Sequence, residues 1–166
     1  DVCSSDLTGA LQLNGGVLQL IGGQTYGFGT TTLGTGTTAA TDTIWVDNLV
    51  AGAAPSAAAI GAITYNNAAT SLTLTAGPLV TSGTAILSTG AVTLANASNA
   101  LTVNNSFFNT AVTTQATLAN VTGAFNFAIG GTGNTVITGA VTTGAGTITK
   151  NGSGTLTLSG ANTTTG

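Results

Sequence analysis

The apolar residues of this chain fall into short runs, each of which is too short to form a helix. Clusters of glycine, asparagine, serine and threonine separate the runs, as at Asn14-Gly15-Gly16. Such an arrangement predicts β-strands of about three to six residues joined by tight corners. We therefore expect a dozen or more strands and an all-β fold. The runs cover residues 11–13, 17–21, 44–46, 63–65, 72–74, 86–87, 92–94, 101–103, 125–129, 136–137, 148 and 156–158.

Charged side chains make up 3% of the chain, against a usual share of about 25%. Threonine, with 36 of 166 residues, favours strands and keeps an uncharged surface hydrated. Disorder fits poorly, because disordered chains combine low hydrophobicity with high net charge, and 42% of these residues are hydrophobic. No apolar run reaches the roughly 20 residues of a spanning helix, so we expect a chain that is not itself membrane-spanning.

One strand-and-corner unit of this size cannot bury its own leucine and isoleucine side chains, so it must stack on copies of itself. Leu72 and Leu74 recur as Val92 and Leu94, twenty residues later. We therefore expect a solenoid with roughly seven or eight turns of about 18 to 25 residues each. A β-sandwich is the alternative, because strands spaced by about 8 to 12 residues are also typical of that fold.

The most regular stretch is residues 144–166, in which Ile148, Leu156 and Leu158 alternate with threonine between glycine-rich corners. This stretch resembles the autotransporter-associated β-strand repeat of bacterial surface and secreted proteins. It departs at Ile148, where leucine is usual, and at Thr164, where an aromatic residue is usual. The resemblance implies a right-handed parallel β-helix in a passenger region, where the repeat assists secretion and folding. The matching residues are Gly144, Gly146, Lys150, Gly152, Gly154, Thr155, Leu156, Thr157, Leu158, Ser159, Gly160, Asn162 and Gly166.

Residues 1–7 match the in-frame translation of a common sequencing-library adaptor, so we predict that they are not native. This would remove Cys3, the chain's single cysteine, and with it any disulfide or thiolate site. Residues 8–166 are then one solenoid fragment, with irregular N-terminal turns over 8–62 and more regular turns over 63–166. Because Gly166 lies inside the repeat motif, we expect the sequence to be a piece of a longer protein.

Three local features each have two interpretations. We expect the region before residue 60 to form looser turns with a protruding loop; the alternative is a second small domain. Phe107 and Phe108 are expected to fill the interior of a wide turn, unless they form an exposed pair that contacts a partner. The recurring asparagines form either side-chain amide ladders along the rod or ordinary corners. These asparagines are Asn96, Asn99, Asn104, Asn105, Asn120, Asn134, Asn151 and Asn162.

The sequence contains few side chains that could take part in catalysis or metal binding. It has no histidine, and its carboxylates beyond the predicted read-through are Asp42 and Asp47, which we expect in one exposed loop. Acid–base catalysis uses histidine or a tuned carboxylate pair, and Ca²⁺ takes six to eight oxygen ligands. The glycine-rich stretches lack the lysine of a phosphate-binding loop. We expect no enzyme activity, no catalytic residue, no metal site and no cofactor.

Two classes of function remain. The first is a structural and export-assisting segment of a passenger protein, secreted or displayed at the cell surface through the outer membrane of a bacterium and in some cases adhesive. Its partners are then the neighbouring turns of the same full-length protein. The second is a binding module for glycans, through Tyr26 and Trp45, or for ice, through threonine rows that are unevenly spaced in the sequence. Nucleic acid is excluded as a partner, because Lys150 alone cannot neutralise a phosphate backbone.

Overall fold

The computed structural model describes residues 9–34, 39–54 and 57–165. These residues form 18 strands and no helix, and every strand pair among them is parallel. The parallel sheets stack into a β-solenoid, which confirms the predicted fold class. A β-sandwich is ruled out, because its two sheets would be built from antiparallel strands. The predicted read-through, residues 1–7, lies outside the described residues.

The strands assemble into three sheets of six strands. Sheet A contains β1 (Leu11–Leu13), β3 (Thr30–Leu33), β7 (Ala62–Tyr65), β10 (Val92–Leu94), β13 (Val121–Gly123) and β16 (Val141–Thr142). Sheet B contains β2 (Gly16–Ile21), β4 (Thr41–Asp47), β8 (Ser71–Ala76), β11 (Asn99–Val103), β14 (Phe127–Gly130) and β17 (Ile148–Lys150). Sheet C contains β5 (Gly52–Ala53), β6 (Ala58–Ile60), β9 (Val80–Thr89), β12 (Val112–Leu118), β15 (Asn134–Ile137) and β18 (Leu156–Leu158).

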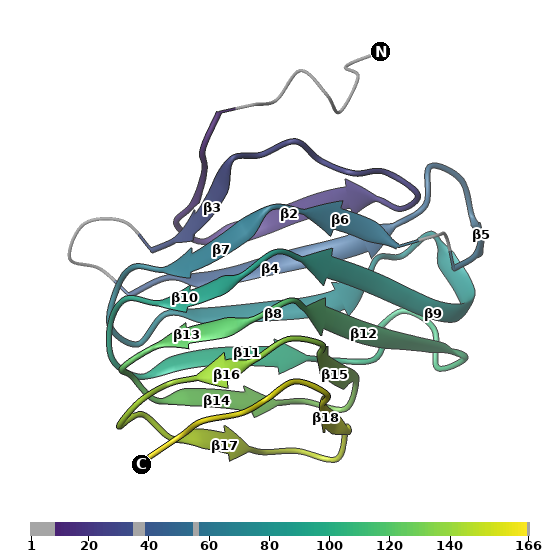
Figure 1. Ribbon diagram of the computed structural model, residues 1–166. Helices are drawn as coiled ribbons and strands as arrows, with labels where there is room; N and C mark the ends of the chain where they lie inside the picture. The colour runs from purple at the N-terminus through teal and green to yellow at the C-terminus, as the bar shows by residue number, and fades with distance from the viewer. Residues whose placement is uncertain (1–8, 35–38, 55–56, 166) are drawn as a thin grey trace.

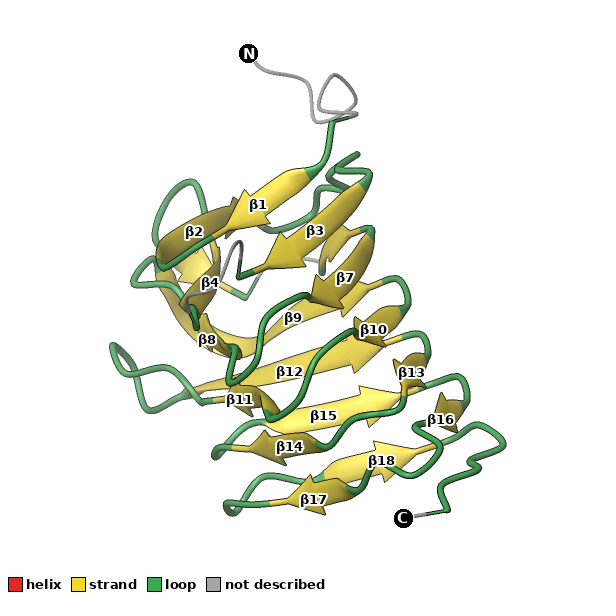
Figure 2. Ribbon diagram, turned by 90° about the vertical axis from the view of Figure 1, so that its left-hand side faces the viewer, coloured by secondary structure: helices red, strands yellow, loops and turns green. Residues whose placement is uncertain are grey.

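From β7 onward the chain visits sheets A, B and C in this order, and each visit adds a strand next to the previous one in that sheet (Figures 1 and 2). Strands β7 to β18 make four complete turns with one strand in each sheet. The turns before them are less regular, because sheet C there holds only β5 and β6, and β5 shifts register against β9. The described residues therefore make fewer turns than the seven or eight that the sequence predicted.

The turns differ in length. In sheet A, Ile63 pairs with Val92 and Val92 pairs with Val121, 29 residues apart in both cases. Val121 then pairs with Val141, only 20 residues further on. The twenty-residue spacing between Leu72 and Val92 was therefore misread, because these residues lie in sheets B and A and are not paired. Leu72 pairs with Leu101 instead.

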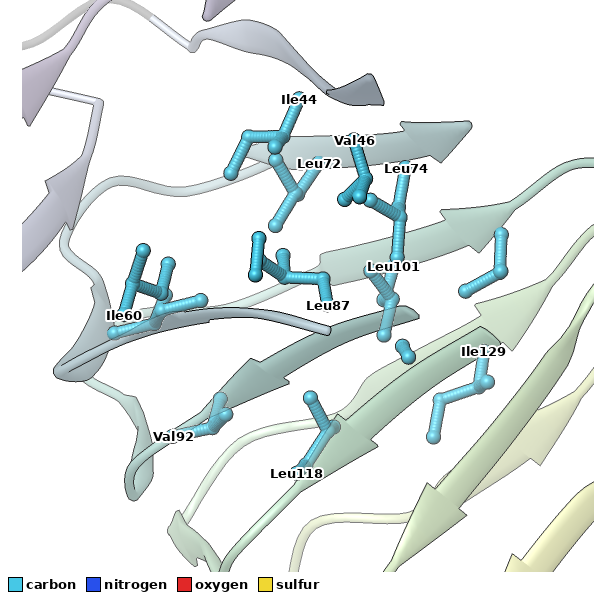
Figure 3. Packing of buried hydrophobic residues seen from close by; sticks show 14 of the residues in the cluster. Ile44, Val46, Ile60, Leu72, Leu74, Leu87, Val92, Leu101, Leu118 and Ile129 are labelled. Atoms are coloured by element: carbon cyan, nitrogen blue, oxygen red, sulfur yellow. The ribbon is translucent and has the colours of Figure 1, made fainter. Parts of the chain in front are cut away.

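The core is a set of columns of inward-facing side chains that run along the axis of the solenoid. Leu72, Leu101 and Ile129 form one column in sheet B, and all three are at most 3% exposed. Figure 3 shows them beside Leu87 and Leu118, which come from sheet C. Because paired residues of parallel strands share a face, each apolar residue is covered by the one in the next turn.

The positions of the aromatic residues correct the predicted use of Phe107 and Phe108. The interior holds Tyr65 and Phe127, whose rings meet edge to face at 5.5 Å. Phe107 and Phe108 lie instead on the loop between β11 and β12, where they are 71% and 52% exposed. The prediction that this pair fills the interior of a turn is therefore wrong; the pair is exposed, as the alternative required, and its contact with a partner stays a prediction. The extra residues of this turn form a surface loop rather than a wider core.

Candidate functional site

The repeat motif forms the last turn of the solenoid. Leu156 and Leu158 pair with the buried Thr135 and Ile137, so they continue inward columns of sheet C. They stay partly exposed, because among the described residues no further strand of sheet C covers them. Thr155, Thr157, Ser159 and Asn162 are exposed, Gly146 is buried, Gly144 forms a bridge with Thr164, and Gly166 lies outside the described residues.

The glycines of the motif let successive corners touch. A Cβ atom at Gly154 would lie 1.7 Å from the carbonyl oxygen of Gly133, and one at Gly160 would lie 2.1 Å from that of Gly139. Gly152, whose φ is +73°, lies in the same way against Gly131. Each pair is 21 residues apart, which is also the distance between paired strand residues Thr135 and Leu156. These glycines are therefore needed for close packing of the corners.

Asparagine side chains connect neighbouring turns in the same region. The Oδ1 atoms of Asn126 and Asn134 accept hydrogen bonds from the backbone N–H groups of Thr147 and Thr155, at 2.9 and 3.0 Å. Asn120 does the same for Ala140 at 2.9 Å. The sequence left open whether Asn120 and Asn134 form amide ladders or ordinary corners. Both bond to the backbone of the next turn and not to another amide, so these bonds form no ladder and satisfy donors where the chain bends; Asn126, which lay outside that prediction, bonds in the same way.

The two carboxylates lie in one strand, β4, and both side chains are buried. The prediction that they share an exposed loop is therefore wrong. Asp47 accepts hydrogen bonds from the backbone N–H groups of Asn48 and Leu79, both at 2.9 Å, and from Gln19 Nε2 at 2.6 Å. Leu79 lies one turn further along the chain. Asp47 therefore links the corner of one turn to the next through these hydrogen bonds.

Asp42 faces the interior, in register with Gly16 above and Leu72 below. Its Oδ1 atom accepts a hydrogen bond from the Gly15 backbone N–H at 2.6 Å, whereas its buried Oδ2 atom has no partner. Burial raises the pKa of the Asp42 carboxyl, and the Gly15 hydrogen bond opposes this only in part. Burial, and secondarily the Asp42 charge, raise the pKa of the Tyr65 hydroxyl. The site is thus a polar group inside an apolar core, compensated by a hydrogen bond at only one of its two oxygens.

No group of three or more potential metal ligands occurs among the described residues. No helix of this part of the chain could cross a membrane. Two surfaces with exposed or half-buried neutral side chains are candidates for contacts with other molecules.

The first candidate is the corner patch, which we define as the exposed Leu49, Val50, Phe107 and Phe108 together with Trp45. These residues lie where sheet B passes into sheet C, on the side that carries the β5 loop in Figure 1. Trp45 packs edge to face against Phe108 at 5.5 Å, which ties the loop after β11 to a strand two turns away.

The aromatic pair expected for glycan binding is not assembled at this patch. Tyr26 stacks on Phe28 with ring centroids 5.7 Å apart, and its hydroxyl donates a hydrogen bond to the Ile21 carbonyl at 3.0 Å. Its hydroxyl also accepts from the Ile21 backbone N–H at 2.8 Å. Tyr26 therefore belongs to the packing of the first turn, and Trp45 is the aromatic residue of the pair that lies at the corner patch.

The second candidate is a threonine column on the outer face of sheet A. Its members are paired one to the next through five strands, from β3 to β16: Thr32, Thr64, Thr93, Thr122 and Thr142. Their uneven spacing in the sequence hid this column, because loops of different length separate strands that are evenly stacked. A test for threonine at a constant interval could therefore not have found it.

Comparison with known proteins adds no assignment: no family model matches the chain, and neither does any curated protein or solved structure. The resemblance of residues 144–166 to the autotransporter-associated repeat therefore stays a prediction from the sequence.

Proposed function

We propose that this chain is a scaffold segment of a bacterial passenger protein, secreted or displayed at the cell surface after export through the outer membrane. The observation that supports this best is the last turn, where stacked glycines and inter-turn asparagine bonds recur at 20 or 21 residues. Such a turn needs no ligand and can be added many times. Its partners are the neighbouring turns of the same full-length protein, and catalysis is not part of the proposal.

The parallel arrangement also suits assistance in export. Each turn pairs only with the turns before and after it, so the solenoid can form stepwise as the chain emerges. The neutral surface contributes little long-range electrostatic attraction or repulsion during this process. Residues 148–158, which hold β17 and β18, would then act as a template for the turn that follows.

Deletion of residues 144–166 from a full-length gene, with surface display measured by protease accessibility in whole cells, tests this proposal. We expect display to fall strongly, because the following turns lose the edge on which they form. A matched control deletes residues 92–120, one turn from β10 to the end of the corner after β12, which brings Val121 to the position of its register partner Val92 and leaves residues 144–166 in place, so display should be largely retained. Unchanged display after the first deletion, or an equal loss after the second, would contradict the proposal.

A second candidate function is binding of an ordered neutral surface, ice or an insoluble glycan. The threonine column favours it, because hydroxyl and methyl groups repeat along sheet A at the strand spacing of about 4.8 Å. Thr93→Lys places a long charged side chain in the column, and Thr113→Lys does the same on sheet C, where Thr113 is also exposed. Only Thr93→Lys should abolish co-sedimentation with cellulose or partition into growing ice; equal binding by both variants would exclude the column.

A further inference from the structure

The corner patch is the part of the surface where large apolar side chains gather. Leu49 and Val50 are 80% and 73% exposed, and Phe107 and Phe108 are each more than half exposed. The first pair lies on the loop from β4 to β5, and the second lies on the loop from β11 to β12, which projects beyond the stacked sheets in Figure 2. Further turns of the chain would stack beyond β2 or β17 in sheet B, so they would leave this corner uncovered.

Polar side chains hold both loops in place from within. In the first loop, Asn48 Nδ2 donates a hydrogen bond to the carbonyl oxygen of Ala53 at 2.8 Å. In the second, the Ser106 Oγ atom accepts hydrogen bonds from the backbone N–H groups of Phe108 and Asn109, at 3.1 and 3.2 Å. Backbone groups that enter an apolar phase must find their partners inside the protein. Because these bonds are made within the chain, they persist when the loop tips leave water.

The patch can leave water without removing a charged side chain from it. Within residues 9–34, 39–54 and 57–165, the charged side chains are Asp42, Asp47 and Lys150. The two carboxylates are already buried and hydrogen-bonded. Lys150 lies in β17, in register with Ile129 and four strands from β4 in sheet B. Burial of the patch therefore avoids the cost of desolvating a charge, and it gains no attraction to anionic headgroups, which requires a cluster of basic residues.

The size of the patch distinguishes between the kinds of partner. A stable protein interface takes about 20 to 30 residues on each side, whereas this patch offers four exposed apolar side chains on two loop tips. A bilayer needs no matching surface, and apolar side chains that bind it enter by about 5 to 10 Å. Trp45, which packs against Phe108, is of a residue type that is enriched at the boundary between lipid and water.

We propose that the corner patch inserts its two loop tips into the surface of an electrically neutral phospholipid bilayer. The tips enter the region between headgroups and acyl chains, and Trp45 lies beside them at the level of the headgroups. The binding is hydrophobic and reversible, and the solenoid lies on the bilayer without crossing it. This goes beyond the proposed scaffold function and does not depend on it, since a scaffold segment that binds no lipid would still be a scaffold segment.

Trp45 is the only tryptophan of the chain, so its fluorescence reports on the patch directly. The test adds phosphatidylcholine vesicles to the whole chain. We expect the Trp45 emission to move to shorter wavelength. Lipids brominated near the headgroup end of the acyl chains should quench it more than lipids brominated at the far end. Added salt, or replacement of part of the lipid by phosphatidylglycerol, should not strengthen binding, because the patch has no basic residue.

A double variant and a matched control separate the patch from the rest of the surface. Leu49→Ser with Phe107→Ser removes one apolar tip from each loop, and vesicle partition should fall by about tenfold or more. Val17→Ser removes an exposed apolar side chain at the start of β2, the end of sheet B away from this corner, and should bind like the parent. Circular dichroism checks that each variant is folded.

Four results would overturn the proposal. The first is an unchanged Trp45 emission with neutral vesicles, and the second is an equal loss of partition in the double variant and in Val17→Ser. The third is binding that requires anionic lipid or, without lipid, a self-association that the double variant abolishes; the latter would assign the patch to a second copy of the chain. The fourth is a Trp45 response to cello-oligosaccharides but not to vesicles, which would assign the patch to a glycan.

Discussion

The long turns and the short turns of this solenoid differ in the contacts that hold one corner against the corner of the next turn. In the long turns, residues 41–118, paired residues are 28 to 30 positions apart, as for Ile44 and Leu74. Their corners are fastened by buried groups such as Asp47 and by the loop that carries Phe108. In the short turns, residues 121–158, the distance falls to 20 or 21, and glycines stack directly on glycines. Parallel pairing between strands is thus the same in both kinds of turn, whereas the residues that hold the corners together differ.

The largest expected effect comes from the long turns. Asp47→Ala removes three hydrogen bonds and leaves the Asn48 and Leu79 backbone N–H groups without this acceptor. We expect the free energy of unfolding in urea to fall by about 3 kcal/mol or more. Thr73→Ala, on the outer face of β8, is the control and should change it by less than about 0.5 kcal/mol. A small effect of Asp47→Ala would remove the proposed difference between the two kinds of corner.

A glycine substitution tests the short turns. Gly154→Ala would place a Cβ atom 1.7 Å from the Gly133 carbonyl oxygen, whereas the nearest atom to a Cβ at Gly130 is 3.6 Å away. We expect Gly154→Ala to lower the free energy of local opening of β17 and β18 by about 2 kcal/mol, and Gly130→Ala to lower it far less. Hydrogen exchange read residue by residue measures this. Equal exchange in the two variants would show that corner stacking is unimportant.

The buried Asp42 makes stability depend on pH. Because burial raises its pKa in the folded state, the folded chain holds this proton more tightly than the unfolded chain does. Its contribution is therefore present below the usual aspartate pKa and is lost as the pH rises through the folded pKa. We expect Asp42→Asn to stabilise the chain by about 1 kcal/mol at pH 7 and to have little effect at pH 3. A stabilisation that is the same at both pH values would contradict this account of Asp42.

The smallest effect concerns a single inter-turn bond. Asn134→Ala removes the acceptor of the Thr155 backbone N–H and should cost about 0.5 to 1 kcal/mol. Asn134→Asp retains an oxygen at the same place and should restore most of the loss. Thermal unfolding of the three chains measures the difference. If alanine and aspartate behave alike, the bond does not contribute to the short turns.

Much of the fold could be predicted, because strand formation depends on local patterns. All twelve apolar runs lie wholly or partly in strands, and the runs at 148 and 156–158 lie in the last two strands, β17 and β18. The strand β12 was missed, since it alternates buried residues with threonine and glutamine and has no apolar run. The turn length was misjudged because a sequence interval does not distinguish a strand in the same sheet from one in the next sheet.

The candidate sites were harder to predict than the strands. Asp42 and Asp47 are five residues apart, and their placement in a buried strand depends on Gly15, Gln19 and Leu79, which contact them from neighbouring turns. The position of Lys150 in an inward column follows only from its register with Ile129. Such contacts join residues about 20 to 30 positions apart, so they become visible only when the register between turns is known.

Disulfide trapping of that register tests the central claim most directly. With Cys3 replaced by serine, cysteine pairs at Thr64/Thr93, Thr93/Thr122 and Thr122/Thr142 occupy aligned positions of adjacent parallel strands in sheet A. Strands in a sheet lie about 4.8 Å apart, within the range that a disulfide spans. We predict that all three pairs oxidise rapidly while a Thr73/Thr93 pair, with the twenty-residue interval, stays reduced. Rapid oxidation of Thr73/Thr93 with none at Thr64/Thr93 would contradict the parallel solenoid described above.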